Sequence, residues 1–95
     1  MTFEEFEKSL ADVTAPKGIN ELLLALWHDG RGDWDGAHQI AQRREGVRDY
    51  DRLHAYLHRV EGDQWNAAYW YRRAGTSMPE VSLKEEWADL VKHFL

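Results

Sequence analysis

Apolar residues recur along most of the chain at the spacing of amphipathic helices, and strand-like alternation is nearly absent. Near the start, Phe3, Phe6, Leu10 and Val13 follow one another at i, i+3, i+7 and i+10, which predicts a helix with one apolar face. A similar stripe near the other end predicts a closing helix; its members are Leu83, Trp87, Leu90, Val91 and Phe94. We therefore expect an all-α protein.

Capping residues and glycines divide this pattern into six predicted helices. Thr2 with Glu5, and Ser82 with Glu85, have the form of capping boxes, in which side chains satisfy free N–H groups of the first turn. The expected helices cover residues 1–13, 20–29, 33–44, 49–61, 63–74 and 82–95. Residues 22–27 are apolar on every side, which predicts that the helix over 20–29 is the most buried of the six.

An internal repeat links residues 23–43 to residues 53–73 at an offset of thirty. Seven of the 21 aligned positions are identical, where background composition would give about one or two. The identical pairs are Leu23/Leu53, Ala25/Ala55, His28/His58, Gly32/Gly62, Asp33/Asp63, Ala37/Ala67 and Arg43/Arg73. The repeat predicts one helical hairpin used twice, with the two copies stacked on a shared core.

The second copy resembles the second half of a tetratricopeptide repeat. That family places a Gly-Asp turn between two antiparallel helices, as at residues 62–63, and a small residue where the helices cross, as at Ala67. It then has an aromatic residue, a second small residue and a closing proline, which Tyr71, Ala74 and Pro79 match. The first copy has the turn and Ala37 but carries Ala41 and Arg44 at the next two places. Residues 57–75 also resemble a motif of small uncharacterised bacterial proteins, a resemblance that implies no activity.

The resemblance implies a short right-handed solenoid of two tetratricopeptide-like hairpins within a single domain, residues 1–95. The hairpins would cover residues 20–46 and 49–75, and the helices at 1–13 and 82–95 would cover the ends. Such a fold implies a protein- or peptide-binding module, and no catalytic motif is present, so a non-enzymatic function without cofactor is favoured.

Charge and composition narrow the classes of partner and location. Lys plus Arg is 12 and Asp plus Glu is 17, so the formal net charge is −5, which argues against nucleic-acid or anionic-membrane binding. The chain has no cysteine, no basic start typical of a signal peptide and no apolar run long enough to span a membrane. A cytoplasmic protein is the expectation.

His28 and His58 occupy equivalent places in the two hairpins, where the family usually has a large aromatic residue. Each imidazole either fills that place and bonds a neighbouring group, or lines a groove shared by the first helices of the hairpins.

Trp70 and Arg73 lie three residues apart on one face, and both are types enriched at binding hot spots. The alternative is that Trp70 packs on the closing helix and Arg73 pairs with Glu85 or Glu86.

Two further functions stay open from the sequence. His54 and His58 lie at i, i+4 with Glu61 one turn later, a polar stripe that is a solvated face, a helix–helix edge, or a site that binds a metal ion or small ligand. The chain could also be a structural subunit of a homo-oligomer, because two repeats are fewer than the three that usually suffice for stability.

Overall fold

Five of the six α-helices begin after capping residues that the sequence provides: Thr2, Asn20, Asp33, Asp63 and Ser82. The helix over Arg48–Val60 begins after Val47, which makes no side-chain cap bond. The computed structural model describes residues 1–95 and contains six α-helices, one short 3-10 helix and no strand. The elements in chain order are α1 (Phe3–Ser9), α2 (Glu21–Gly30), α3 (Trp34–Ala41), η1 (Gln42–Arg44), α4 (Arg48–Val60), α5 (Gln64–Arg73) and α6 (Leu83–Phe94). The prediction of an all-α chain with about six helices is confirmed.

The two predicted capping boxes differ in how completely they form. At α1, the Thr2 hydroxyl accepts from the Glu5 N–H (3.1 Å), and the Glu5 carboxylate accepts from the Thr2 N–H (3.0 Å). At α6, the Ser82 hydroxyl accepts from the Glu85 N–H (3.1 Å), but the Glu85 carboxylate bonds the Ser82 hydroxyl rather than its backbone. The second box is therefore half formed, although it still marks the start of the helix.

The repeated sequence forms the same turn twice. The Asp33 N–H donates to the His28 carbonyl and the Asp63 N–H donates to the His58 carbonyl, each at 2.9 Å, which closes the end of α2 and of α4. Gly32 and Gly62 precede these aspartates with φ of 81° and 86°, a left-handed conformation that glycine adopts without a Cβ clash. Each aspartate then accepts an N–H of the next helix as its N-cap.

The first helix is shorter than the apolar stripe predicts. It ends at Ser9, and Val13 is 91% exposed, so its place in the stripe was wrong. Side chains of α2 and its turn bond the carbonyls that follow: the Trp27 indole N–H donates to Ser9 (3.1 Å), and the Arg31 guanidinium donates to Leu10 (2.7 Å) and Asp12 (2.6 Å). These tertiary hydrogen bonds satisfy carbonyl groups at and after the C-terminal end of α1.

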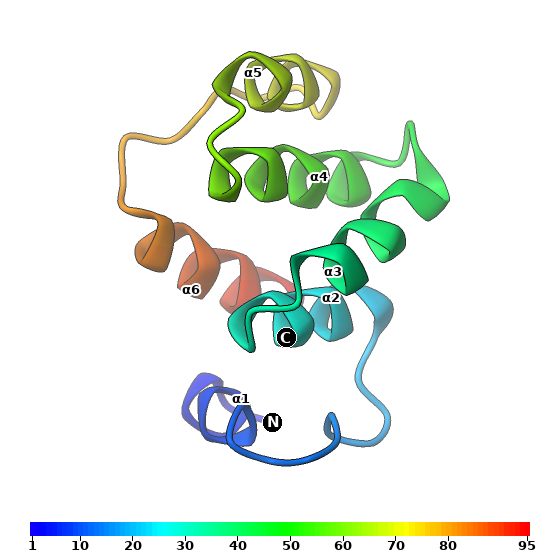
Figure 1. Cartoon of the computed structure of the whole chain (residues 1–95), viewed down its shortest axis with the longest axis vertical. Helices are drawn as coiled ribbons and strands as arrows, with labels where there is room; N and C mark the ends of the chain where they lie inside the picture. Colours follow the sequence, from blue (N-terminus) through cyan, green and yellow to red (C-terminus); the bar gives the residue numbers. More distant parts are fainter.

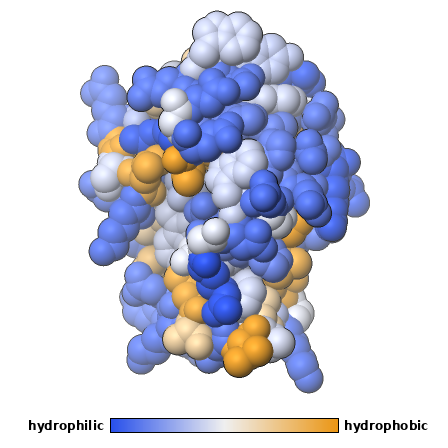
Figure 2. All heavy atoms as spheres, in the orientation of Figure 1, coloured by the Kyte–Doolittle hydropathy of each residue, from blue (hydrophilic) through white to orange (hydrophobic).

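Helices α4 and α5 lie at one end of the molecule and α1 at the other, with α2, α3 and α6 between them (Figure 1). α2 packs on α3, α4 packs on α5, and α6 contacts α1, α2 and α4. The larger core cluster draws residues from α1, α2, α3, α4 and α6, and a smaller one lies between α4 and α5 around Ala55, Ala67, Trp70 and Tyr71. Hydrophilic residues cover most of the face seen in Figure 2, with apolar atoms in separate small areas.

The most buried helix is α4, not α2 as the apolar pattern predicts. Seven of its thirteen residues are buried, against four of ten in α2. α4 packs against α3, α5, α2 and α6, so its polar side as well as its apolar side is covered. Burial of polar side chains such as His54 and Asp51 follows from this central position.

A buried ion pair fastens α6 to the second hairpin. Glu86 of α6 is 1% exposed, and its carboxylate accepts from the Arg59 guanidinium of α4 (2.8 Å) and from the Tyr71 hydroxyl of α5 (2.6 Å). Arg59 also donates to the Val81 carbonyl in the α5–α6 connection. One carboxylate therefore joins three helices.

None of the helices is both long and apolar enough to cross a membrane.

Candidate functional site

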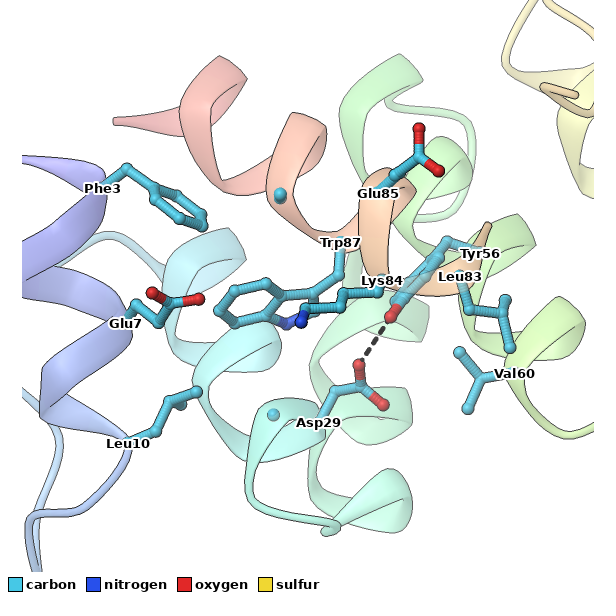
Figure 3. Close-up of a pocket in the computed structure, with 12 residues that line it drawn as sticks. Phe3, Glu7, Leu10, Asp29, Tyr56, Val60, Leu83, Lys84, Glu85 and Trp87 are labelled. Carbon is cyan, nitrogen blue, oxygen red and sulfur yellow. Dashed lines mark hydrogen bonds between the residues drawn. The ribbon is translucent and has the colours of Figure 1, made fainter. Parts of the chain in front are cut away.

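A groove of about 580 Å³ opens between α1, α6 and the C-terminal ends of α2 and α4. Figure 3 shows Trp87 of α6 across its middle, with Phe3 of α1 and Leu10, the residue after that helix, on one side and Val60 of α4 on the other. The lining is predominantly apolar, and the volume falls in the range of about 300–1,000 Å³ that is usual for ligand sites.

Three carboxylates and one lysine make up the charged part of this groove: Glu7, Asp29, Glu85 and Lys84. Asp29 accepts a hydrogen bond from the Tyr56 hydroxyl (2.9 Å), the contact drawn in Figure 3. Burial raises the pKa of Asp29, although the Tyr56 bond opposes that change. Outside the lining, Lys92 lies over the ring of Phe3, at 4.9 Å from its centroid. The groove therefore combines apolar walls with a mostly acidic set of polar groups.

The histidines expected to share a groove do not line this one. His28 is half-buried and faces the N-cap of α3, with Nδ1 at 3.6 Å from Asp33. His58 is buried, and its Nδ1 bonds the Glu61 carboxylate at 2.7 Å. The equivalent positions in the repeat thus have different surroundings, because Trp34 and His38 of α3 pack against His58, whereas the ring beside His28 is that of Trp27 in its own helix. Their role in binding a partner stays a prediction.

Trp70 and Arg73 contact each other, as their spacing predicts, but Trp70 is buried rather than exposed. Its ring stacks on the ring of His54 at 3.9 Å between centroids, and it does not pack on α6. The Arg73 guanidinium lies 5.0 Å from the Trp70 ring and bonds the Tyr69 hydroxyl (3.3 Å). Glu86 pairs with Arg59 and Glu85 bonds Ser82, so the alternative in which Arg73 pairs with Glu85 or Glu86 does not occur.

The polar stripe of α4 is covered by its neighbours. His54 is 3% exposed and His58 is 8% exposed, whereas Glu61 at the end of the stripe is exposed. The imidazole of His38, from α3, completes a cluster with these two histidines: the Nε2 atoms of His38 and His54 lie 3.0 Å apart. One ring nitrogen from each of the three histidines lies within 4.8 Å of the other two.

Aromatic rings border the cluster of His38, His54 and His58, which we call the histidine cluster. Trp34 stacks on His38 with centroids 4.6 Å apart and planes 12° apart, while Trp70 stacks on His54 on the other side. The Trp34 indole N–H donates to the Leu57 carbonyl (2.7 Å), which fixes its ring against α4. The Nδ1 atom of His54 is buried without a hydrogen-bond partner.

The surroundings of the histidine cluster disfavour protonation. Burial, followed by the charges of His38 and His58 and then of Arg73, lowers the pKa of His54 to about 4. Burial and the charge of His58 also lower the pKa of His38, against the opposing effect of Glu61 and Asp35. Near neutral pH these two rings are therefore uncharged, and an uncharged ring keeps a nitrogen lone pair.

His38 and the groove residues were not predicted as site residues. A signal for His38 was present: Trp34 and His38 lie at i, i+4 beside Ala37, the residue expected where the helices cross. No comparable signal existed for the groove, because Leu10, Asp29, Val60 and Trp87 come from four separate parts of the chain, and no repeat indicates how these parts pack together.

Comparison with known proteins adds no relative from which a function could be transferred. No protein-family model matches the chain, and neither a curated protein nor a solved structure matches it significantly. The functional argument therefore rests on the geometry of the groove and of the histidine cluster.

Proposed function

We propose that the protein is a non-enzymatic binding module that captures a short segment of a partner protein. The observation that carries this proposal is the groove between α1, α2, α4 and α6, which has apolar walls, a volume suited to a few side chains and polar groups at defined places. Its one internal hydrogen bond joins the Tyr56 hydroxyl to Asp29, and burial beside that carboxylate raises the pKa of Tyr56, so the hydroxyl stays protonated and is a poor nucleophile.

The finer architecture belongs to the same proposal. The α2–α3 and α4–α5 pairs would be two tetratricopeptide-like hairpins in a short right-handed solenoid, capped by α1 and α6. The identical turns at Gly32 and Gly62, and the fully buried Ala37 and Ala67, support this assignment. Binding by such helical modules usually places a helix or an extended segment against a groove. A cytoplasmic location is a prediction from the composition.

The chemistry of the groove indicates a partner segment with apolar side chains and at least one Lys or Arg. Trp87, Val60 and Leu10 offer an apolar surface, and Glu7, Asp29 and Glu85 outnumber Lys84. A net charge of −5 on the whole chain would further favour encounter with a basic segment. Homo-oligomerisation would bring a second copy of an equally acidic chain to this groove, so we favour a different partner.

Selection from a displayed library of random peptides tests the proposal. We expect the full chain to enrich peptides that combine apolar residues with Lys or Arg. Replacing Val60 with lysine should weaken the binding of a selected peptide at least about tenfold, because it puts a positive charge into an apolar wall facing a basic ligand. Titration of the labelled peptide by fluorescence anisotropy measures the change.

Val47→Lys is the matched control, since Val47 is exposed in the connection before α4 and does not line the groove. This variant should bind the selected peptide like the parent. Enrichment of no peptide family, or equal weakening by the two lysine substitutions, would contradict the proposal.

A further inference from the structure

The separations within the histidine cluster are close to those of ligands around one metal ion. Two nitrogen atoms bound to Zn²⁺ at about 2.0–2.1 Å with a tetrahedral angle lie about 3.3 Å apart. The Nε2 atoms of His38 and His54 are 3.0 Å apart, and a nitrogen of His58 lies within 4.8 Å of both. A movement of the His58 nitrogen by up to about 1.5 Å would bring the three nitrogens to ligand distances.

Glu61 orients the third ring for this role. Its carboxylate bonds Nδ1 of His58 at 2.7 Å, so that nitrogen carries the proton and Nε2 keeps its lone pair. A carboxylate behind a histidine is the usual outer partner of a metal-bound imidazole, where it fixes the tautomer and raises the basicity of the ligand. Glu61 therefore lies behind His58 as its outer partner. The sequence alone had suggested Glu61 as a ligand of the metal ion.

The rings of His38 and His54 are fixed in position, but their surroundings do not fix one tautomer. Trp34 and Trp70 stack on His38 and His54, which restricts the rotation of both imidazoles. One of the facing Nε2 atoms of His38 and His54 carries the proton of their 3.0 Å hydrogen bond, a proton that a metal ion would displace. The Nδ1 atom of His54 has no partner that fixes the tautomer of this ring. Preorganised, uncharged imidazoles are what metal binding requires, because a proton on the ligand nitrogen competes with the ion.

A carboxylate lies directly beside the cluster. Glu61 bonds His58, whereas the Arg73 guanidinium lies over the Trp70 ring, 5.0 Å from its centroid. A second combination, His58 with Glu61 and Asp63, also brings ligand atoms together. It is less suitable because both Asp63 oxygens accept from Asn66, and because Nδ1 of His58 is the atom bonded to Glu61.

We propose that His38, His54 and His58 bind one divalent transition-metal ion, of which Zn²⁺ fits the ligand set, with Glu61 as the positioning residue for His58. Three imidazoles suit Zn²⁺ and its late first-row neighbours rather than Mg²⁺ or Ca²⁺, which prefer oxygen ligands. None of the three histidines lines the groove, so this site is independent of the peptide-binding proposal.

Calorimetric titration of the untagged, chelator-treated full chain with ZnSO₄ at pH 7.5 tests the site. We expect one ion per chain. His38→Gln and His54→Gln should each weaken binding by at least about 100-fold through loss of a ligand, and Glu61→Gln by about 10–100-fold through loss of the outer bond. The melting temperature of metal-free Glu61→Gln should stay close to that of the parent, which separates positioning of His58 from a purely structural role.

His28→Gln and His93→Gln are the matched controls, because both histidines are outside the cluster and pair with aspartates nearer the surface. Circular dichroism verifies folding of every variant, and His38, half-buried on α3, carries the test if the His54 variant does not fold. Absence of one-to-one binding, unchanged affinity in His38→Gln, or equal weakening in the two control variants would overturn the proposal.

Discussion

Replacing Arg59 with methionine is expected to destabilise the protein by about 3–5 kcal/mol. The guanidinium of Arg59 is the only cation bonded to Glu86, whose carboxylate is almost completely buried between α4, α5 and α6. Methionine fills much of the same space but leaves that carboxylate charged and unpaired, and an uncompensated buried charge is costly. The Tyr71 hydroxyl supplies one remaining bond and cannot neutralise the charge.

Urea unfolding followed by circular dichroism measures this change. Arg72→Met is the matched control, because Arg72 is exposed on α5 and has no ion-pair partner, so its free energy of unfolding should change by no more than about 0.5 kcal/mol. Adding Glu86→Gln to Arg59→Met should restore part of the lost stability, since it removes the buried charge. A loss below about 1 kcal/mol in Arg59→Met would show that the pair is not buried as described.

Replacing Trp87 with alanine should cost a similar amount, about 3–5 kcal/mol. Trp87 is 8% exposed, packs against Phe3 and Phe6 with centroids 6.0 and 5.9 Å away, and donates its indole N–H to the Leu26 carbonyl at 2.9 Å. Truncation leaves a large cavity between α1, α2 and α6 and a carbonyl without its donor. Because Trp87 also forms the middle of the groove, peptide binding should be lost together with stability.

Trp65→Ala is the matched control for this variant. Trp65 is 77% exposed on α5, so its removal should change the free energy of unfolding by no more than about 0.5 kcal/mol while deleting the same side chain. Urea unfolding of the two variants side by side gives the comparison. Similar losses from the two substitutions would contradict the packing described for α6.

The candidate sites show how far residue patterns lead toward function. The i, i+4 spacing of His54 and His58 correctly placed both rings on one side of a helix, because that spacing follows from helix geometry alone. The third imidazole comes from another helix, and its approach depends on how α3 crosses α4. The groove was beyond prediction for the same reason, since its lining joins four helices.

Local chemistry in the sequence determined where most helices begin and turn. Asn20, Asp33, Asp63 and Ser82 cap helices, and the glycine turns form as the repeat indicates, because these features depend on residues within one or two turns of each other. The tertiary structure decided which side chains are buried. Side chains of α2 and its turn bond carbonyls at and after the early end of α1, and the central position of α4 buried a polar stripe for which the sequence also allowed a solvated face. Such outcomes depend on which surfaces meet, and contacts between residues far apart in the chain leave no periodic signal in the sequence.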